Sequence, residues 1–432
     1  MTLSTIFKKT IITTSVVFAI INSGLAQSGN YNSLAGQQVN NNLNTITTAV
    51  PFLIITPDSR AGGMGDAGVA SSPDVNAIHW NASKLAFEDK KMGIGVSYTP
   101  WLRALVPDIN LAYLSWYYKT KKRGTVAASL RYFSLGDITF TDINGNTIGQ
   151  FRPNEYAIDV AYGVKLAKQF SVGGAVRFIN SNLTGGTFVD GAATKPGRAV
   201  AVDISALWRN DKIRFSGKQK AIAAIGLNIS NIGSKVSYSD RVSNGIASSN
   251  FLPINMRLGA SLTFEMDDYN SISIEVDANK LLVPTPPVYK HNIVTDTNGV
   301  QVDKGVLYDA SGSPVVLLGK DPNRGVTEGI FGSFNDAPGG TKEELREINY
   351  GAGLEYWYNK LFAVRAGYFY ESPYKGNRKF FTLGAGVKYN VFGLDFAYLI
   401  PTQQRNPLEN TLRFTLTFDF DAFKAQNEAT GE

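Results

Sequence analysis

Residues 254–264 read INMRLGASLTF, and this stretch places an apolar side chain at every second position. The positions between are polar, charged or small: Asn255, Arg257, Gly259, Ser261 and Thr263. Because successive side chains of a β-strand point to opposite faces, a period of two predicts a strand with one apolar and one polar face. The same alternation recurs in residues 156–165 and 412–420.

Segments of this kind follow one another along most of the chain. We count fourteen of them, at approximately residues 91–100, 109–119, 124–135, 155–166, 169–180, 198–210, 220–232, 253–265, 270–279, 347–358, 361–371, 378–390, 392–400 and 411–420. Each is close to the roughly 9–11 residues with which a tilted strand crosses a bilayer, and barrels of bacterial outer membranes have an even number of strands. The pattern predicts an all-β fold, a 14-stranded antiparallel transmembrane β-barrel. A large soluble β-protein with one hydrated face would share the period of two.

The connections between the segments alternate between short and long. The short ones are residues 120–123, 167–168, 267–268, 359–360 and 390–391. The longer ones include residues 136–154, 181–197, 233–252 and 280–346. Periplasmic turns and extracellular loops of outer-membrane barrels alternate in this way, whereas a soluble β-sandwich has no reason to do so. We therefore expect residues 280–346 to form one long extracellular loop.

Fifteen charged residues within the segments fall on the polar phase. They are Arg131, Asp159, Lys165, Arg177, Asp203, Arg209, Arg257, Glu275, Asp277, Glu355, Arg365, Lys388, Asp395, Arg413 and Asp419. A charge facing lipid near the middle of a bilayer costs roughly 2–4 kcal/mol, so a barrel must turn such residues into its lumen. The phasing predicts a charged lumen, a lipid-facing outer surface and residence in the outer membrane.

Composition agrees with this class of protein. Aromatic residues are abundant at 12%, and charged residues are sparse at 18%. The net charge is only +6, and the basic residues are scattered rather than clustered as in a protein that binds nucleic acid. The absence of cysteine excludes disulfides and thiolate metal sites.

The chain divides into five parts by composition. Lys8 and Lys9, the apolar residues 11–21 and the small residues Gly24 and Ala26 predict a cleaved signal peptide over residues 1–26, with an uncleaved anchor as the alternative. We then expect a flexible segment at 27–55, a plug at 56–90, the barrel at 91–420 and a tail at 421–432.

Several predicted extracellular stretches are more apolar than loops that only connect strands. Their prominent residues are Trp101, Leu102, Leu105, Leu281, Leu282, Val283, Val316, Leu317, Phe331 and Phe334. Exposed apolar patches usually mark interaction surfaces, so these residues are candidates for partner binding. Alternatively, they fold over one another and close the mouth of the barrel. Within the long loop, Thr341 and Glu344 have the spacing of a capping box and predict a short helix over residues 341–348.

Catalysis finds little support in the sequence. His79 and His291 are the only histidines, and neither lies in a recognisable motif. We expect no catalytic residue, no cofactor and no metal site. Carboxylates and arginines on the polar phase are expected to form structural ion pairs in the lumen.

Two stretches carry a resemblance to a known family. Residues 59–70 (SRAGGMGDAGVA) and 77–86 (AIHWNASKLA) resemble the N-terminal hatch of FadL-type fatty-acid transporter barrels. The positions that carry the likeness are Arg60, Gly63, Gly65, Gly68, Trp80 and Asn81. Where that family has Asn-Pro-Ala, this chain has Asn81, Ala82 and Ser83. The resemblance implies a fourteen-stranded barrel over residues 56–420 with the hatch inside it.

Within that superfamily, the sequence of the hatch motifs and the long loop are most similar to the PorV branch, also called LptO, of the Bacteroidetes type IX secretion system. The branch implies a cargo receptor. Its partners would be the giant translocon barrel, the C-terminal domains of cargo proteins, a cell-surface attachment complex containing a sortase, and outer-membrane lipid.

Three functions therefore compete. The first is a non-enzymatic receptor and shuttle for type IX cargo, which is the function that the resemblance favours. The second is a transporter of long-chain fatty acids or other hydrophobic molecules. It would need an apolar internal pocket, a mobile plug and an opening near the third strand. The third is an outer-membrane hydrolase, which would need a clustered nucleophile and base.

Overall fold

The structure, a computed structural model, describes residues 43–420 with short gaps at 104, 121–123, 142–143, 187, 190–191, 217–218, 240–241, 244–245, 248, 296–300 and 404–405. The predicted signal peptide, residues 27–42 of the predicted flexible segment and the predicted tail lie outside the described residues. No helix within the described part of the chain is both long enough and apolar enough to cross a membrane.

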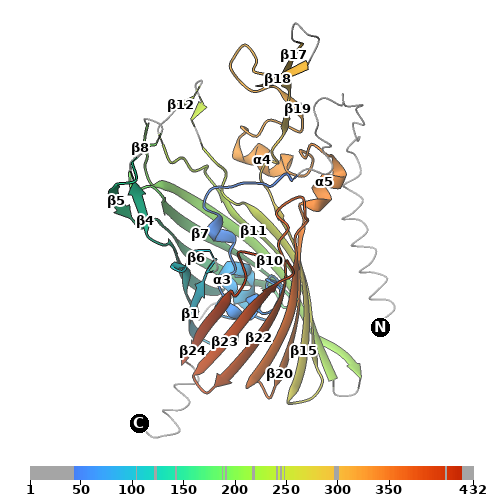
Figure 1. The fold of residues 1–432 in the computed structure, drawn as a ribbon. Helices are drawn as coiled ribbons and strands as arrows, with labels where there is room; N and C mark the ends of the chain where they lie inside the picture. Colours follow the sequence, from blue (N-terminus) through green and yellow to red (C-terminus); the bar gives the residue numbers. More distant parts are fainter. Residues whose placement is uncertain are drawn as a thin grey trace.

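Fourteen antiparallel strands close into a barrel, which confirms the predicted fold (Figure 1). In order around the barrel they are β1 (Met92–Pro100), β2 (Ile109–Lys119), β3 (Gly124–Leu135), β6 (Asn154–Ala167), β7 (Phe170–Asn182), β10 (Gly197–Ser216), β11 (Gln219–Gly233), β14 (Asn255–Glu265), β15 (Asn270–Leu281), β20 (Asn349–Tyr358), β21 (Phe362–Tyr370), β22 (Lys379–Tyr389), β23 (Phe392–Pro401) and β24 (Leu412–Asp419). Pairing of β1 with β24 closes the ring, so no barrel strand is left with a free edge along its whole length.

Long and short connections fall at opposite ends of this barrel, which we call the loop end and the turn end. Among the described residues, the loop end carries five small two-stranded ladders. They pair β4 (Ile138–Thr141) with β5 (Thr147–Phe151), β8 (Phe188–Val189) with β9 (Ala192–Ala193), β12 (Val242–Ser243) with β13 (Ile246–Ala247), β16 (Val288–Tyr289) with β19 (Val316–Leu318), and β17 (His291–Thr295) with β18 (Gln301–Val306). At the turn end, Asn359 and Lys360 both adopt positive φ, as a tight two-residue hairpin turn requires.

The predicted phase of the charges is also seen in the strands. Those near mid-strand are buried, namely Arg131, Asp159, Arg177, Asp203, Arg257, Glu275, Asp277, Glu355, Arg365, Asp395 and Arg413. Apolar residues on the other phase remain exposed, for example Ile158 at 46% and Val176 at 57%, because they form the surface that faces lipid.

Residues 44–91 run through the lumen from the loop end to the turn end (Figure 1). The amide of Asn44 donates to the Tyr374 carbonyl at the loop end, and the amide of Lys119 donates to the Lys91 carbonyl at the turn end. The short helices between them are η2 (Pro51–Ile54), α2 (Ser59–Gly62), α3 (Ala77–Trp80) and η3 (Ala82–Phe87). Because residues 49–53 join the largest core cluster, the flexible segment predicted over residues 27–55 must end earlier than expected.

Candidate functional site at the loop end

The connection between β15 and β20 forms an ordered arm above the barrel mouth (Figure 1). It contains the β16–β19 and β17–β18 ladders, followed by α4 (Val326–Gly332) and α5 (Thr341–Arg346). A connection of this length without contacts would stay flexible, so the contacts that hold it decide which surface it presents.

A buried network of charges anchors the base of the arm. Glu347, just after α5, lies with Oε2 2.5 Å from Lys280 Nζ and with Oε1 3.0 Å from Lys375 Nζ. Lys280 also pairs with Glu344 at 3.1 Å, and Lys375 pairs with Glu343 at 2.6 Å. The network therefore joins α5 to the end of β15 and to the connection between β21 and β22. We call these five residues the arm anchor.

The N-terminal segment is tied to the same place. The side-chain amide of Asn44 donates to the Pro286 carbonyl at 3.1 Å and to Glu343 Oε1 at 2.9 Å. Thr285 donates its hydroxyl to Glu347 Oε1 at 2.6 Å. The chain that leads into the lumen thus shares hydrogen bonds with the arm that covers the mouth.

The start of α5 differs from the predicted capping box. The N-cap residue is Gly340, with φ of 65°, and no side chain caps the helix. Glu344 accepts hydrogen bonds from the amides of Asp336 and Ala337 at 2.7 and 2.9 Å, which lie upstream of the helix. Gly340 supplies a backbone conformation that is costly for other residues, so the turn before α5 fixes its start.

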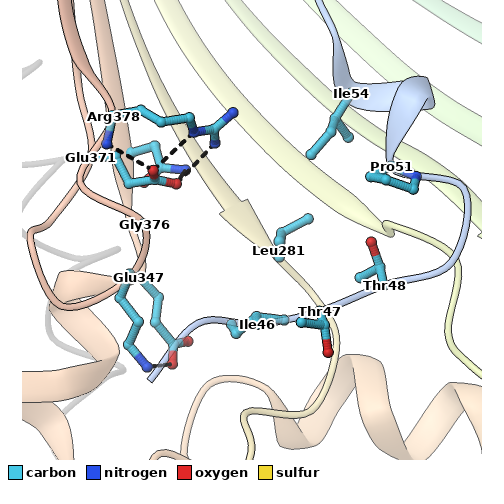
Figure 2. A pocket seen from close by; sticks show the side chains of 12 residues that line it. Ile46, Thr47, Thr48, Pro51, Ile54, Leu281, Glu347, Glu371, Gly376 and Arg378 are labelled. Atoms are coloured by element: carbon cyan, nitrogen blue, oxygen red, sulfur yellow. Dashed lines mark hydrogen bonds and ion pairs between the residues drawn. The ribbon is translucent and has the colours of Figure 1, made fainter. Parts of the chain in front are cut away.

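A cavity of about 340 Å³ opens beside the arm anchor (Figure 2). One side is apolar, with Ile46, Ile54 and Leu281. The other side is charged, with Glu371 and Arg378 joined at 2.9 Å between Oε2 and Nε. Each carboxylate at this cavity already pairs with a cation, so the arrangement holds segments together and offers no activated nucleophile or free base.

Burial and neighbouring charges act in opposite directions on the acids of the arm. Burial alone would raise the pKa of Glu347, but the ammonium groups of Lys280 and Lys375 outweigh it and leave the pKa lower than usual. Burial raises the pKa of Asp336 to about 6, helped by the nearby Glu344 carboxylate and opposed by Arg324. The arm therefore contains one acid that the fold stabilises as an anion and one that it stabilises as the neutral form.

This contrast predicts a pH dependence. Because the folded pKa of Asp336 is about 6 and its unfolded value is about 3.9, its stabilising contribution is present below pH 4 and is lost as the pH rises through 6. This difference between the folded and unfolded pKa corresponds to a change of up to about 3 kcal/mol in the free energy of unfolding of the arm. Asp336→Asn should remove this decline in arm stability between pH 4 and 6, measured by amide exchange over residues 326–346. A slope equal to that of the wild type would contradict the assignment.

The structure divides the predicted partner-binding residues into exposed and buried sets. Leu105, Leu317, Phe331 and Phe334 are exposed, at 64%, 44%, 74% and 47%. Leu282 and Val283 are buried at 2% and 1%, where they join the core cluster at the mouth. The partly buried residues are Trp101, Leu102, Leu281 and Val316.

For Leu282 and Val283 the prediction of an exposed binding surface needs correction, because their side chains pack inward. Their neighbours in the core cluster include Phe52 and Leu53 of the lumen segment, so these two residues close the mouth. Trp101 packs against this cluster as well, and together with Leu102 it packs against a second cluster that contains Phe369 and Phe380.

The positions that carried the hatch resemblance come together in the lumen. Arg60 pairs with Glu355 at 2.8 Å, and Asn81 donates to the Val69 and Ala206 carbonyls at 3.0 and 3.2 Å. Gly68 lies so close to Trp80 that a Cβ there would be 2.5 Å from the indole ring. Gly63 and Gly65 likewise face the backbone of barrel strands.

The arm anchor was not predicted as a unit. Its residues come from the end of β15 and from two connections, and they show no common spacing, so only the acidic cluster at residues 343–347 hinted at it. Among the residues that the structure describes, no group of three or more His, Asp or Glu side chains is arranged to hold a metal ion.

Comparison with known proteins gives one family match. The model of the family described as type IX secretion system protein PorV matches residues 37–288, more than half of the chain. This part includes the lumen segment and the barrel from β1 to β15. No curated protein sequence matches the chain significantly.

Solved structures show only a general likeness. The monoaromatic hydrocarbon channel CymD is 13% identical with a TM-score of 0.42, over 85% of this chain and 98% of that chain. The toluene transporter TodX of Pseudomonas putida is 10% identical with a TM-score of 0.42, over 87% and 99%. A FadL homologue from Pseudomonas aeruginosa is 11% identical with a TM-score of 0.41, over 87% and 99%. Similarity at this level says nothing about the ligand of this chain.

Proposed function

The chain belongs to the PorV family of type IX secretion system proteins, and from this premise we propose that it is a non-enzymatic receptor for secreted cargo. It is an outer-membrane component of that system. In the proposal, its loop end binds the C-terminal domain of a cargo protein as the cargo leaves the giant translocon barrel. The complex then passes the cargo to the cell-surface attachment complex that contains a sortase.

The observation that carries this proposal is a set of exposed apolar side chains on a firmly held arm. Phe331 of α4 and Leu345 of α5 are 74% and 51% exposed, and Phe334 and Leu317 add 47% and 44%. Exposed aromatic groups on an ordered support are typical of protein-binding surfaces, because little entropy is lost when they are covered. We call these four residues the arm patch.

Transport of hydrophobic molecules through the barrel wall is less well supported. Such transport would need a gap beside β3, but β3 pairs without a register shift with β2 and with β6 over most of its length. The loop-end cavity has an apolar side, yet ion pairs of the arm anchor border it.

Replacement of both aromatic residues tests the receptor. Phe331→Ser with Phe334→Ser should weaken capture of a cargo C-terminal domain by at least about 100-fold, because burial of each ring contributes about 1.5–3 kcal/mol. The measurement is a pull-down from the native membrane in mild detergent, followed by titration with the recovered cargo domain.

Ile138→Ser is the matched control, since Ile138 is 42% exposed on the β4–β5 ladder of another loop. It should leave capture unchanged. Equal capture by the wild type and the double variant would rule out the arm patch as the binding surface. Recovery of a monomer that carries only lipid or fatty acid would favour the transporter instead.

A further inference from the structure

Positive charge is concentrated on one side of the turn end. The strands β2, β3, β6, β7, β10 and β11 are consecutive around the barrel, and three turns join them in pairs. Residues 119–123, 165–168 and 209–220 hold eleven Lys or Arg residues and a single acid, Asp211. The next turn around the barrel is acidic, with Glu265, Asp267 and Asp268. The run of basic turns therefore extends from β2 to β11 and ends at the β14–β15 turn.

The β10–β11 hairpin carries the most exposed part of this charge. β10 pairs with β7 only as far as Trp208 opposite Phe170, so its residues 209–216 continue beyond the neighbouring turn (Figure 1). Twenty residues are about twice the length that crosses a bilayer. The end of this hairpin consequently stands outside the hydrocarbon layer.

Within the hairpin, two cations face each other. Arg214 and Lys220 are directly opposed in the β10–β11 ladder, and both side chains are exposed. Like charges in such a pair repel each other. Within the part of the chain that the structure describes, neither has a carboxylate within ion-pair distance. Lys212 and Lys168, which are also exposed, extend the same surface.

Aromatic residues lie just inside these cations along the strands. Trp208 precedes the β10 extension, Tyr162 lies before the second turn, and Phe170 follows it; their side chains are 37%, 46% and 38% exposed. Trp and Tyr at the surface of a membrane protein mark the level of the lipid headgroups. The order along each strand is therefore apolar, aromatic and then cationic, so Lys168 lies next to the headgroup level and the cations of the β10–β11 hairpin lie on its water side.

We propose that Lys168, Lys212, Arg214 and Lys220 bind anionic phospholipid headgroups of the leaflet at the turn end. Phosphates between Arg214 and Lys220 would offset their mutual repulsion, and lipid would gather on this part of the rim only. The barrel would then present a fixed part of its rim, from β2 to β11, to anionic lipid.

Quenching of tryptophan fluorescence by brominated lipid tests this directly, because Trp208 lies beside the proposed site. The full-length protein is reconstituted into phosphatidylcholine vesicles that contain brominated phosphatidylglycerol or brominated phosphatidylcholine at equal mole fraction. The wild type should show stronger quenching by phosphatidylglycerol, and added salt should reduce the excess. The triple variant Lys212→Gln, Arg214→Gln, Lys220→Gln should lose roughly 100-fold in relative affinity, about 5-fold for each charge.

A triple variant at the other end of the barrel is the matched control, with the same change of charge: Lys290→Gln, Lys304→Gln, Lys320→Gln. It should keep the stronger quenching by brominated phosphatidylglycerol. Heat-modifiable migration of each variant in gel electrophoresis should show that all of them are folded barrels. An excess that is absent in the wild type, or that survives in the turn-end variant, would overturn the proposal. Retention of an acidic soluble protein by the wild type alone, without any lipid preference, would also overturn it and assign these cations to that partner.

Discussion

Gly65→Val should displace the segment in the lumen. The barrel would then either fold with an open, permeable lumen or fail to fold. Gly65 has φ of +69°, and a Cβ there would lie 2.5 Å from the Tyr368 carbonyl oxygen and 2.7 Å from that of Ala352. These are backbone atoms of barrel strands, so they cannot turn away. Overpacking and a strained backbone together cost several kcal/mol. Uptake of a large hydrophilic antibiotic by whole cells should rise by at least about tenfold. A loss of only about 1.4 kcal/mol in the binding of the lumen segment raises the fraction of open barrels by that factor.

A second glycine separates the effect of space from that of backbone strain. Gly145 also has a positive φ, of 83°, but a Cβ there would meet nothing within 4 Å. Gly145→Val therefore carries the same type of strain on an exposed loop and should leave uptake unchanged. Equal uptake by the two variants would show that residues 56–90 do not plug the lumen.

The barrel could be predicted from the sequence because the membrane imposes two simple constraints. A lipid-facing surface requires an apolar residue at every second position, and the thickness of the bilayer sets the strand length. Arg257 and Asp277 show how strict the first constraint is, since both fall on the polar phase and both are buried in the lumen. The largest error concerns β10, which was expected to end near residue 210 and continues to Ser216.

That error has a physical reason. Residues 209–212 (RNDK) are all polar and interrupt the alternation, and Ile213 and Phe215 then fall on the opposite phase from Trp208. Beyond the bilayer neither face of a strand must be apolar, so this break does not end the strand. Pairing with β11, interrupted by register shifts, keeps residues 209–216 in a strand.

The site was harder to predict than the barrel because contacts between loops follow no period. Leu282 and Phe331 look alike in the sequence, yet one is 2% exposed and the other 74%. Only the docking of the lumen segment against the mouth distinguishes them, and that contact joins parts of the chain more than 200 residues apart. Glu347 likewise gains its partners Lys280 and Lys375 only when the end of β15 and two connections meet.

Glu347→Ala should release the arm. The substitution removes the carboxylate that Lys280 and Lys375 share, and leaves two largely buried ammonium groups with fewer partners. Loss of one partner from a buried ion pair costs about 3–5 kcal/mol. We expect proteolysis within residues 320–345 to become at least about 100-fold faster, since 2.7 kcal/mol corresponds to that factor. Capture of cargo should fall with it, because the arm patch would lose its support.

Glu328→Ala provides the comparison, since Glu328 is an exposed acid on α4 of the same arm. It removes an equal charge without breaking a buried pair and should leave both proteolysis and capture unchanged. Two further results are informative because they separate the anchor from the surface that it supports. Rapid proteolysis with normal capture would mean that cargo binds elsewhere on the loop end. Slow proteolysis in Glu347→Ala would mean that apolar packing of Leu282 and Val283 holds the arm, and the ion pairs would then serve only to fill a buried polar space.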